Sequence, residues 1–293
     1  MIHRPRRAFL GFLCALACAA LLPSAAGAVI VGIGDQSPAM FSDQRFLALH
    51  ITEARVGVSW NVAIGHPLEL QAARVWLRAA ADAGVTPLVT FAGSGNYIPT
   101  VAQYTRAVRA FIRDFPSVTR YTPWNEPDWV YRTLSQKPGL AAAYFNALVR
   151  SCRGCLILAG DLYLPAGQLG PWLRAYRRGL RYHPAGWALH NYYDVRTHTA
   201  RQLRVMLSLT RGPIWVDESS GVLRRGHWQF RNQSAAAAAR DERFLFSLPT
   251  RFPRITRIYH YQWQAPPLDW DSGLIAVNGR PRPGYQVVAA AAG

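Results

Sequence analysis

The chain contains 293 residues, of which 50% are hydrophobic and 17% charged, so it can form a large core and is not an intrinsically disordered protein. Its formal net charge is +17, and because Lys137 is the only lysine, nearly all of the positive charge comes from arginine. This charge either attracts an acidic polymer or reflects arginines spread over helix surfaces, and we prefer the second interpretation. No nucleic-acid-binding motif accompanies the arginines, so a nucleic-acid partner is not expected. The arginines form groups on predicted helices, at 106, 109 and 113 and at 174, 177, 178 and 181.

Residues 1–28 are expected to be a signal peptide and not a part of the fold. A basic segment at 4–7 precedes an apolar run at 8–22, and Ala26-Gly27-Ala28 offers a small-residue cleavage site. The apolar run is shorter than the ~20 residues that a membrane-spanning helix needs. The basic segment also resembles a twin-arginine export signal, although an ordinary secretory signal, an uncleaved anchor and lipidation at Cys18 are alternatives. We therefore predict a secreted protein without a stable membrane span.

From Val29 onward, short apolar runs alternate with amphipathic helical segments. The eight runs that resemble strands are Val29–Gly34, Ala54–Trp60, Thr86–Phe91, Thr119–Trp124, Leu156–Asp161, Trp187–Tyr192, Pro213–Asp217 and Ile255–Trp263. Such alternation predicts an α/β fold with a parallel sheet. Eight units favour a closed (β/α)8 TIM barrel over a doubly wound open sheet, because no glycine-rich phosphate loop follows the first strand. Because the sequence shows no linker, we expect a single catalytic domain over 29–293. We also expect the protein to be a monomer.

Helices are predicted between these strands. Apolar residues recur with the 3.6-residue period over 101–115 and over 68–79, and the alanine run 235–239 is expected to begin another helix. Helix-to-strand turns are marked by Gly84, Gly154 and Gly212.

Only two cysteines, Cys152 and Cys155, lie outside the predicted signal peptide, and their spacing is C-x-x-C. In a cytosolic protein this spacing would suggest redox chemistry or half of a zinc site. Here no second cysteine pair exists, and export favours oxidation. We predict a local disulfide before the strand at Leu156, which stabilises the fold little because the loop that it closes is short.

Two of the five glutamates stand at the ends of predicted strands. Glu126 lies in Trp124-Asn125-Glu126-Pro127 after the fourth strand, and Glu218 ends the run Ile214–Glu218 in the seventh. In a barrel the carboxyl ends of all strands meet at one rim, so these two side chains can converge. Paired carboxylates are what cleavage of a glycosidic bond needs, one as proton donor and the other as nucleophile or base.

This pattern resembles glycoside hydrolase clan A, the retaining (β/α)8 glycosidases, which carry Asn-Glu at the end of strand 4 and Glu at the end of strand 7. The likeness extends over essentially the whole of 29–293, and the chain is similar to small secreted members related to families 5, 39 and 128. The resemblance implies that Glu126 is the acid/base and Glu218 the nucleophile. It also implies retaining hydrolysis of a β-linked glycan or exopolysaccharide, neutral or acidic, without a cofactor.

The resemblance also implies roles for five other residues. Asn125 would bind the sugar 2-hydroxyl, and Arg55 in the second strand matches the arginine that keeps the nucleophile ionised. His190 and Tyr192, read as the end of strand 6, match a His-x-Tyr motif whose tyrosine donates to the nucleophile. Trp263, at the end of strand 8, matches the tryptophan that forms the floor of the reactive sugar's subsite.

Other residues near the strand ends have no clear assignment. Asp161 ends strand 5 and could line the cleft, but no role follows from its position. Asp217 is expected to point away from Glu218, because side chains alternate along a strand. Three tryptophans could either stack on sugar rings or serve only in packing: Trp129, Trp228 and Trp270.

The region after strand 3 departs from the clan's pattern. Several clan members carry a histidine or a second asparagine there, whereas this chain has Phe91–Tyr97, in which only Asn96 could substitute. The substrate is therefore open. The histidines are scattered without metal-site spacing, so no metal is expected.

Two rival functions remain. The first is a non-catalytic protein that binds glycan or the cell envelope on a degenerate barrel, although such a protein has no need of both glutamates. The second is a transglycosylase, which uses the same covalent intermediate and cannot be separated from a hydrolase by sequence.

Overall fold

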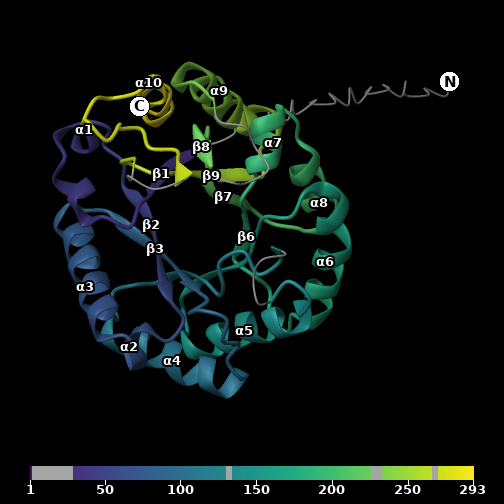
Figure 1. Cartoon of the computed structure of the whole chain (residues 1–293). Coiled ribbons are helices and arrows are strands. Elements are labelled where there is room, and N and C mark those ends of the chain that lie inside the picture. The colour runs from purple at the N-terminus through teal and green to yellow at the C-terminus, as the bar shows by residue number, and fades with distance from the viewer. Residues whose placement is uncertain (2–28, 130–133, 226–232, 266–269) are drawn as a thin grey trace.

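In a computed structural model, the chain forms a closed barrel of eight parallel strands surrounded by helices (Figure 1). The structure describes residues 1, 29–129, 134–225, 233–265 and 270–293. The predicted signal peptide and Trp228 therefore lie outside the described residues. In the part of the chain that is described, no helix has the length and apolar character needed to cross a membrane.

Each of the eight predicted runs forms a strand of the barrel, which confirms the (β/α)8 prediction. The strands are β1 Ile30–Gly34, β2 Glu53–Ser59, β3 Thr86–Ala92, β4 Arg120–Thr122, β5 Leu156–Leu162, β6 Gly186–Leu189, β7 Ile214–Ser219 and β9 Ile255–Tyr261. β1 pairs with both β2 and β9, and this second pairing closes the barrel. A separate two-stranded sheet joins β8 Arg224–Arg225 to β10 Trp270–Asp271.

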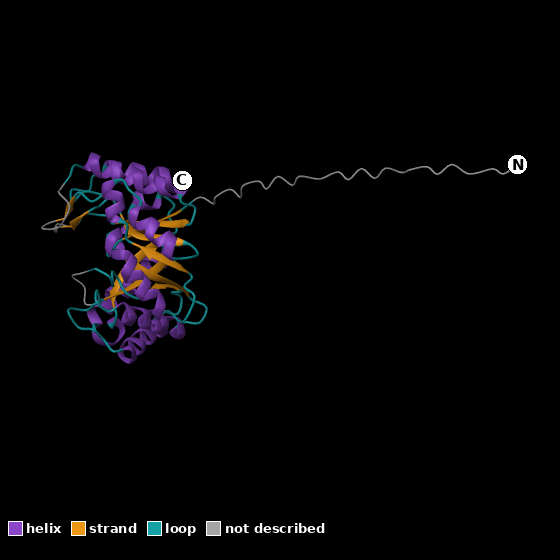
Figure 2. Ribbon diagram, turned by 90° about the vertical axis from the view of Figure 1, so that its right-hand side faces the viewer, coloured by secondary structure: helices purple, strands orange, loops and turns teal. Residues whose placement is uncertain are grey.

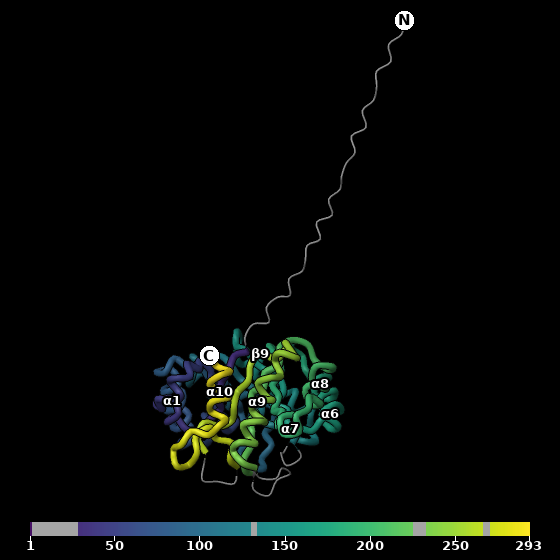
Figure 3. Tube along the Cα trace, turned by 90° about the horizontal axis from the view of Figure 1, so that it is seen from above, coloured from purple at the N-terminus to yellow at the C-terminus, as the bar shows by residue number. Residues whose placement is uncertain are grey.

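The helices cover the outside of the barrel, with the strands enclosed by them in the side view (Figure 2). They are η1 Pro38–Ser42, α1 Gln44–Leu47, α2 Val62–Gly65, α3 Pro67–Asp82, α4 Val101–Asp114, α5 Pro138–Ser151, α6 Ala166–Gly179, α7 Tyr192–Thr197, α8 Arg201–Leu209, α9 Ala235–Arg251 and α10 Pro283–Ala292. α9 begins at the predicted alanine run, and it packs beside α10 (Figure 3).

α4 illustrates why these segments are helical. Thr100 and Gln103 form a capping box at its start, which satisfies backbone N–H groups that have no partner within the helix. Its apolar residues follow the 3.6-residue period, so Tyr104, Val108 and Phe111 face the barrel and are fully buried. The arginines of the same helix lie on its outer face.

The interior of the barrel is filled by side chains. Leu88, Leu158, Trp215 and Tyr259 form a separate buried cluster inside it. Gly160 makes room for this packing, because a Cβ atom there would lie 2.5 Å from the carbonyl oxygen of Ala188. With its interior filled, the barrel can offer a reaction site only at a rim.

The turns also follow the sequence. Gly84, Gly154 and Gly212 have φ values of +70°, +82° and +85°, a conformation that glycine adopts without steric cost. Gly154 lies between Cys152 and Cys155, which form the predicted disulfide with a Cα–Cα distance of 5.5 Å.

Three strands end at least two residues earlier than predicted. β4 stops at Thr122, so Trp124 and Glu126 lie in a loop after the strand. β6 stops at Leu189, and Tyr192 is the first residue of α7, where the backbone has already turned helical. β9 stops at Tyr261, two residues before Trp263. Apolar side chains continue beyond each strand, which is why the sequence pattern extends too far.

Candidate active site

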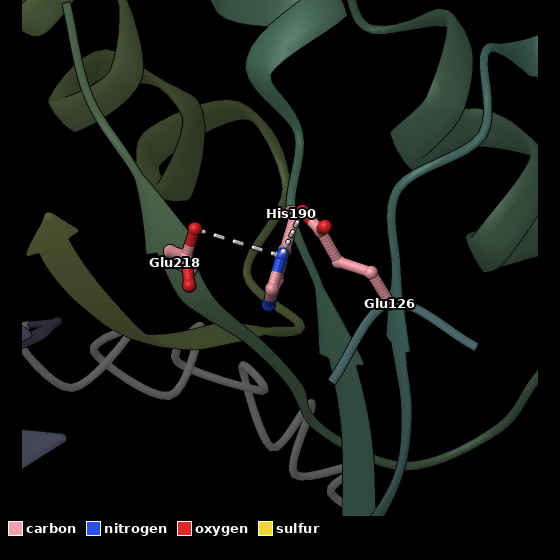
Figure 4. Close-up of side chains that lie close together, drawn as sticks. All are labelled: Glu126, His190 and Glu218. Carbon is pink, nitrogen blue, oxygen red and sulfur yellow. Dashed lines mark hydrogen bonds and ion pairs between the residues drawn. The ribbon is translucent and has the colours of Figure 1, made fainter. Parts of the chain in front are cut away.

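Glu126 and Glu218 converge at the carboxyl end of the barrel, as the strand order predicts. One carboxylate oxygen of each glutamate and a ring nitrogen of His190 all lie within 4.8 Å of one another. Figure 4 shows His190 between the two carboxylates, with the glutamates approaching from opposite sides. Glu126 lies in the loop after β4 and Glu218 lies in β7, so closure of the barrel brings the two side chains together.

Glu126 is held in a loop whose backbone is fixed. Its φ is +46°, which is uncommon for a residue other than glycine and marks a position that the surrounding structure determines. The preceding residue, Asn125, donates its backbone N–H to the carbonyl oxygen of Phe91 at 2.7 Å, which ties the loop to the end of β3. The Glu126 side chain is buried, and its Oε1 lies 3.1 Å from Nδ1 of His190.

Glu218 has different partners. Arg55 Nη1 donates to its Oε2 at 2.6 Å, and the Tyr192 hydroxyl donates to its Oε1 at 3.1 Å. Arg55 Nη2 also donates to Oδ1 of Asn125 at 2.8 Å. A single guanidinium therefore fixes both the Glu218 carboxylate and the amide beside Glu126.

His190 is fully buried and touches charged groups on all sides. Its Nε2 lies 3.4 Å from Nη2 of Arg55 and 3.7 Å from Oδ2 of Asp217. Burial acts to lower the pKa of His190, but the carboxylates of Glu218 and Asp217 outweigh it and raise this pKa well above the usual value. The ring therefore favours the imidazolium form.

Asp217 does not point away from the site, so the expectation from strand alternation was wrong. Its Oδ2 lies 3.3 Å from Nε of Arg55, and the residue is fully buried. The reason is a bulge: three steps of β7, from Val216 to Ser219, pair with two steps of β9, from Ile258 to His260. A bulge of this kind breaks the alternation of side chains at the end of a strand.

Asp161, for which the sequence suggested no role, completes this group. It is fully buried, and its Oδ2 lies 3.8 Å from Nη2 of Arg55 and accepts a hydrogen bond from the Thr122 hydroxyl at 2.6 Å. One carboxylate oxygen of Asp161 lies within 4.8 Å of one of Asp217, so the two buried acids affect each other's protonation. Burial and the Asp217 charge raise the pKa of Asp161, whereas His190 and Arg55 lower that of Asp217 against its burial. Asp161 is therefore the protonated partner.

Two aromatic residues, Tyr261 and Trp263, stand at the end of β9. Trp263 is 2% exposed, and its ring packs edge-on against Phe46 and near Tyr285. Its indole N–H donates to Asp43 at 3.1 Å, so it offers no open face to a sugar. Burial and then the Glu218 charge raise the pKa of Tyr261, which places its hydroxyl within the electrostatic reach of Glu218.

Asp128 was not assigned by sequence, although it lies two residues after Glu126. It is 1% exposed, and its carboxylate accepts the backbone N–H groups of Tyr163 and Leu164 at 2.9 to 3.1 Å. Burial, with a smaller contribution from Glu126, raises the pKa of Asp128 to about 7 against the opposing effect of these N–H groups. The loop that carries Glu126 is thereby joined to the loop after β5.

Two of the unassigned tryptophans lie beside the site. Trp129 packs 5.4 Å from the ring of Tyr163, and Trp270 packs 5.2 Å from that of Tyr192. Both are partly buried members of an aromatic cluster around Tyr163 and Tyr192. Asn96 is exposed.

Two groups of acids around His190 are compact enough to surround a metal ion. In both groups, however, the Arg55 guanidinium already lies within 4.0 Å of a carboxylate oxygen. This cation neutralises the charge that a metal would neutralise, so the donor set does not call for one.

No protein-family model matches the chain, and no curated protein is similar to it in sequence. Solved structures do match. A GH5_18 structure from Streptomyces cattleya in complex with GlcNAc is 16% identical, with a TM-score of 0.68 over 90% of this chain and 79% of that one. A GH128 (subgroup I) endo-β-1,3-glucanase from Amycolatopsis mediterranei is 16% identical, with a TM-score of 0.57 over 90% and 98%.

A family 39 glycoside hydrolase from the gut symbiont Bacteroides cellulosilyticus WH2 is also 16% identical, with a TM-score of 0.62. The match covers 90% of this chain but only 63% of that protein. At this level of identity the likeness concerns the fold. The chain therefore has the (β/α)8 barrel fold of glycoside hydrolases from families 39, 5 and 128, as the resemblance to clan A predicts.

Proposed function

We propose that this protein is a retaining glycoside hydrolase that cleaves a β-linked glycan through a covalent glycosyl-enzyme intermediate. The observation that carries the proposal is the convergence of Glu126 and Glu218, whose nearest oxygens lie within 4.8 Å. Retaining enzymes hold their carboxyl groups about 5–5.5 Å apart, whereas inverting enzymes leave about 6.5–9.5 Å for a water molecule.

The partners of the two glutamates support distinct roles. Glu218 accepts hydrogen bonds from Arg55 and Tyr192, which stabilise its carboxylate form and suit a nucleophile that attacks the anomeric carbon. Glu126 is buried on the other side of His190 from Glu218, with its Oε1 3.1 Å from Nδ1 of the His190 ring. Because Glu218 takes the part of nucleophile, Glu126 is assigned the part of acid/base, which donates a proton to the leaving oxygen and then accepts one from the attacking water.

Asn125 and His190 complete this assignment. With its Oδ1 held by Arg55, the Asn125 amide group is oriented so that its NH2 can donate to the sugar 2-hydroxyl. His190 lies between the two glutamates, with Nδ1 3.1 Å from Oε1 of Glu126 and 3.9 Å from Oε1 of Glu218, so it acts as a positioning residue between the two carboxylates.

The substrates of the structural neighbours support a β-glycan. These neighbours include an endo-β-1,3-glucanase, a GH113 β-1,4-mannanase and xylanase 10B from Thermotoga maritima. A transglycosylase would use the same residues. A protein that only binds glycan is disfavoured by the buried charges around Arg55, because burying charges costs stability and a binding surface does not require it.

The test is a screen of the purified protein against β-glucans, mannans and exopolysaccharides, followed by proton NMR of the first product formed. We expect the product to keep the β configuration. Glu126→Gln and Glu218→Gln should each abolish turnover, whereas Glu69→Gln should not, because Glu69 only accepts the backbone N–H of Ser59. Persisting activity in either of the first two variants, or an inverted product, would overturn the assignment.

We also propose that the protein is exported as a monomer after removal of residues 1–28. N-terminal sequencing of the protein recovered outside the cell should begin at Val29, and light scattering should give the mass of one chain. A first residue other than Val29 would place the cleavage site elsewhere.

A further inference from the structure

Four hollows on the surface of the barrel share lining residues and form one continuous run. The first two, with volumes of about 630 and 590 Å³, share Arg109 and Arg150. Tyr182 joins the second to a third of about 370 Å³, and Arg177 and Arg211 join the third to a fourth of about 450 Å³. We call this connected run the basic track.

The basic track lies away from the glutamates. It follows the outer face of α4, passes the disulfide loop at the end of α5 and continues to the turn after α8. α4, α5, α6 and α8 are consecutive around the barrel (Figure 1). The third and fourth hollows are lined mainly by helix-to-strand connections, at the rim opposite to the one that carries Glu126 and Glu218, and the first lies along the outer face of α4. The track is therefore a surface separate from the proposed active site.

Charge distinguishes this surface. Nine arginines line the four hollows, and no aspartate or glutamate does. Most of them are exposed and make no salt bridge with another described residue, including Arg106, Arg109, Arg150, Arg153, Arg177 and Arg211. Arg113 is the exception, since it pairs with Asp114 at 3.2 Å.

The arginines of the track also act on one another. Arg254 donates to the carbonyl oxygens of Thr210, Gly212 and Leu207 and so anchors the turn after α8. Burial and the like charge of Arg211 lower its pKa. Such mutual repulsion is unfavourable in the isolated protein and is relieved when an anion is bound.

The shape and chemistry of the track favour one kind of ligand. A connected series of hollows fits a single extended chain better than a flat membrane surface. Guanidinium groups bind carboxylates through paired hydrogen bonds. Proteins that bind single-stranded nucleic acids stack successive bases on several aromatic rings, but Tyr182, 40% exposed, is the only large exposed ring among the lining residues. One such ring suits the apolar face of a sugar.

We propose that the basic track binds an anionic polysaccharide whose sugars carry carboxylate groups. This inference goes beyond the proposed hydrolase function and does not depend on it. Binding at the track requires neither Glu126 nor Glu218, so it should be unchanged in Glu126→Gln.

The test is isothermal titration calorimetry with polygalacturonate, using neutral laminarin and a single-stranded oligonucleotide as comparison ligands. The fourfold variant R106Q/R109Q/R150Q/R153Q should bind polygalacturonate about tenfold or more weakly at moderate ionic strength. The matched control R201Q/R204Q/R240Q/R243Q removes the same charge from exposed arginines outside the track and should lose less than about threefold. Circular dichroism should show that both variants are folded.

Three results would overturn the proposal. Equal losses in the two variants would mean that binding follows net charge and not the track. Tighter, track-dependent binding of the oligonucleotide would identify a nucleic-acid surface instead. No binding of polygalacturonate by the unmodified protein would exclude a polyuronate ligand, whatever the outcome of the glycosidase screen.

Discussion

Two charged clusters lie at opposite ends of the barrel and are built from the same strand. Glu53 and Arg55 are two residues apart on β2, so both side chains point into the barrel. Glu53 is at the end of the barrel away from the proposed site. It accepts hydrogen bonds from Arg257 and from the Tyr259 hydroxyl, and Arg120 lies 2.6 Å from it.

The cluster around Arg55 has the opposite balance. One guanidinium faces three acids, Glu218, Asp217 and Asp161. Three buried oxygens in this cluster, Oδ1 of Asp161 and both Oδ atoms of Asp217, accept no hydrogen bond from a described residue.

The comparison separates a structural ion cluster from one suited to catalysis. Glu53 has more cations than it needs, so its pKa is lowered despite its burial and its charge is fixed. The acids near Arg55 share too few cations for all of them to be ionised. The pKa of Asp161 is therefore raised and that of Asp217 is lowered, so Asp161 keeps its proton. Perturbation of this second kind is typical of active sites.

Replacing one arginine of each cluster by lysine tests whether only the cluster around Arg55 supports catalysis. Arg55→Lys should reduce kcat on the glycan substrate about 10²- to 10³-fold, because one ammonium cannot reach Glu218, Asn125 and the two aspartates together. Arg257→Lys, at the other end, should leave kcat within about twofold, since it contacts only Glu53 and the face of Trp215. Kinetics with urea unfolding of both variants would check this, and equal losses of kcat would contradict it.

Two isosteric substitutions test which of the two acids, Asp161 or Asp217, carries a proton. Asp161→Asn keeps a donor toward Asp217, so it should cost less than about tenfold in kcat. Asp217→Asn removes the ionised group beside His190 and Arg55 and should cost about 10²-fold. Because the Asp217 carboxylate helps to raise the pKa of His190, its loss should also move the limb of the pH–rate profile that follows His190 to lower pH.

A larger loss in Asp161→Asn than in Asp217→Asn would mean that the proton resides on Asp217. An unchanged pH profile in Asp217→Asn would show that His190 does not control it. Either result can be separated from misfolding by the thermal unfolding midpoint of each variant.

The barrel and the position of the glutamates could be predicted from sequence because both depend on local patterns. Strands buried on both faces give short apolar runs, and the turns before them require a positive φ, as at Gly84 and Gly212. Once eight strands are placed, Glu126 and Glu218 must share a rim. Arg55 and Tyr192, which contact Glu218 in the structure, were found through resemblance to a family.

The rest depended on features that sequence periodicity does not contain. Asp217 was misplaced because a bulge between β7 and β9 reverses one step of alternation. Trp263 was assigned to the sugar subsite through the resemblance, and only its packing on Phe46 in the structure shows that the tryptophan is covered. Some arginines of the basic track were grouped by helix from the sequence, but the surface that joins them combines four helices and their turns, which are far apart in sequence.

At the other end of β2, Glu53→Gln should lower the free energy of unfolding by about 2 kcal/mol at pH 7, because it leaves two arginines without their shared anion. A lowered carboxylate pKa gives stability that is present above the unfolded value of about 4.3 and is lost as the pH falls through the folded value. The difference between the variant and the unmodified protein should therefore begin to shrink as the pH falls below about 4.3 and should disappear only below the lowered folded pKa. Urea titrations from pH 3 to 8 would measure it, and a constant difference would contradict the assignment.

Asp128 differs from both the Glu53 cluster and the Arg55 cluster, because it is a buried acid whose partners among the described residues are backbone N–H groups and not a cation. Its raised pKa, about 7, means that the folded state favours the protonated form. The unmodified protein should therefore lose stability as the pH rises from about 4, the unfolded value, to about 7. Asp128→Asn mimics the protonated acid and keeps an oxygen for the N–H groups of Tyr163 and Leu164. Its stability should vary less across this window than that of the unmodified protein. Parallel pH dependence in urea titrations of the two proteins would show that the backbone donors alone keep Asp128 ionised, and that a buried carboxylate in this barrel needs no arginine.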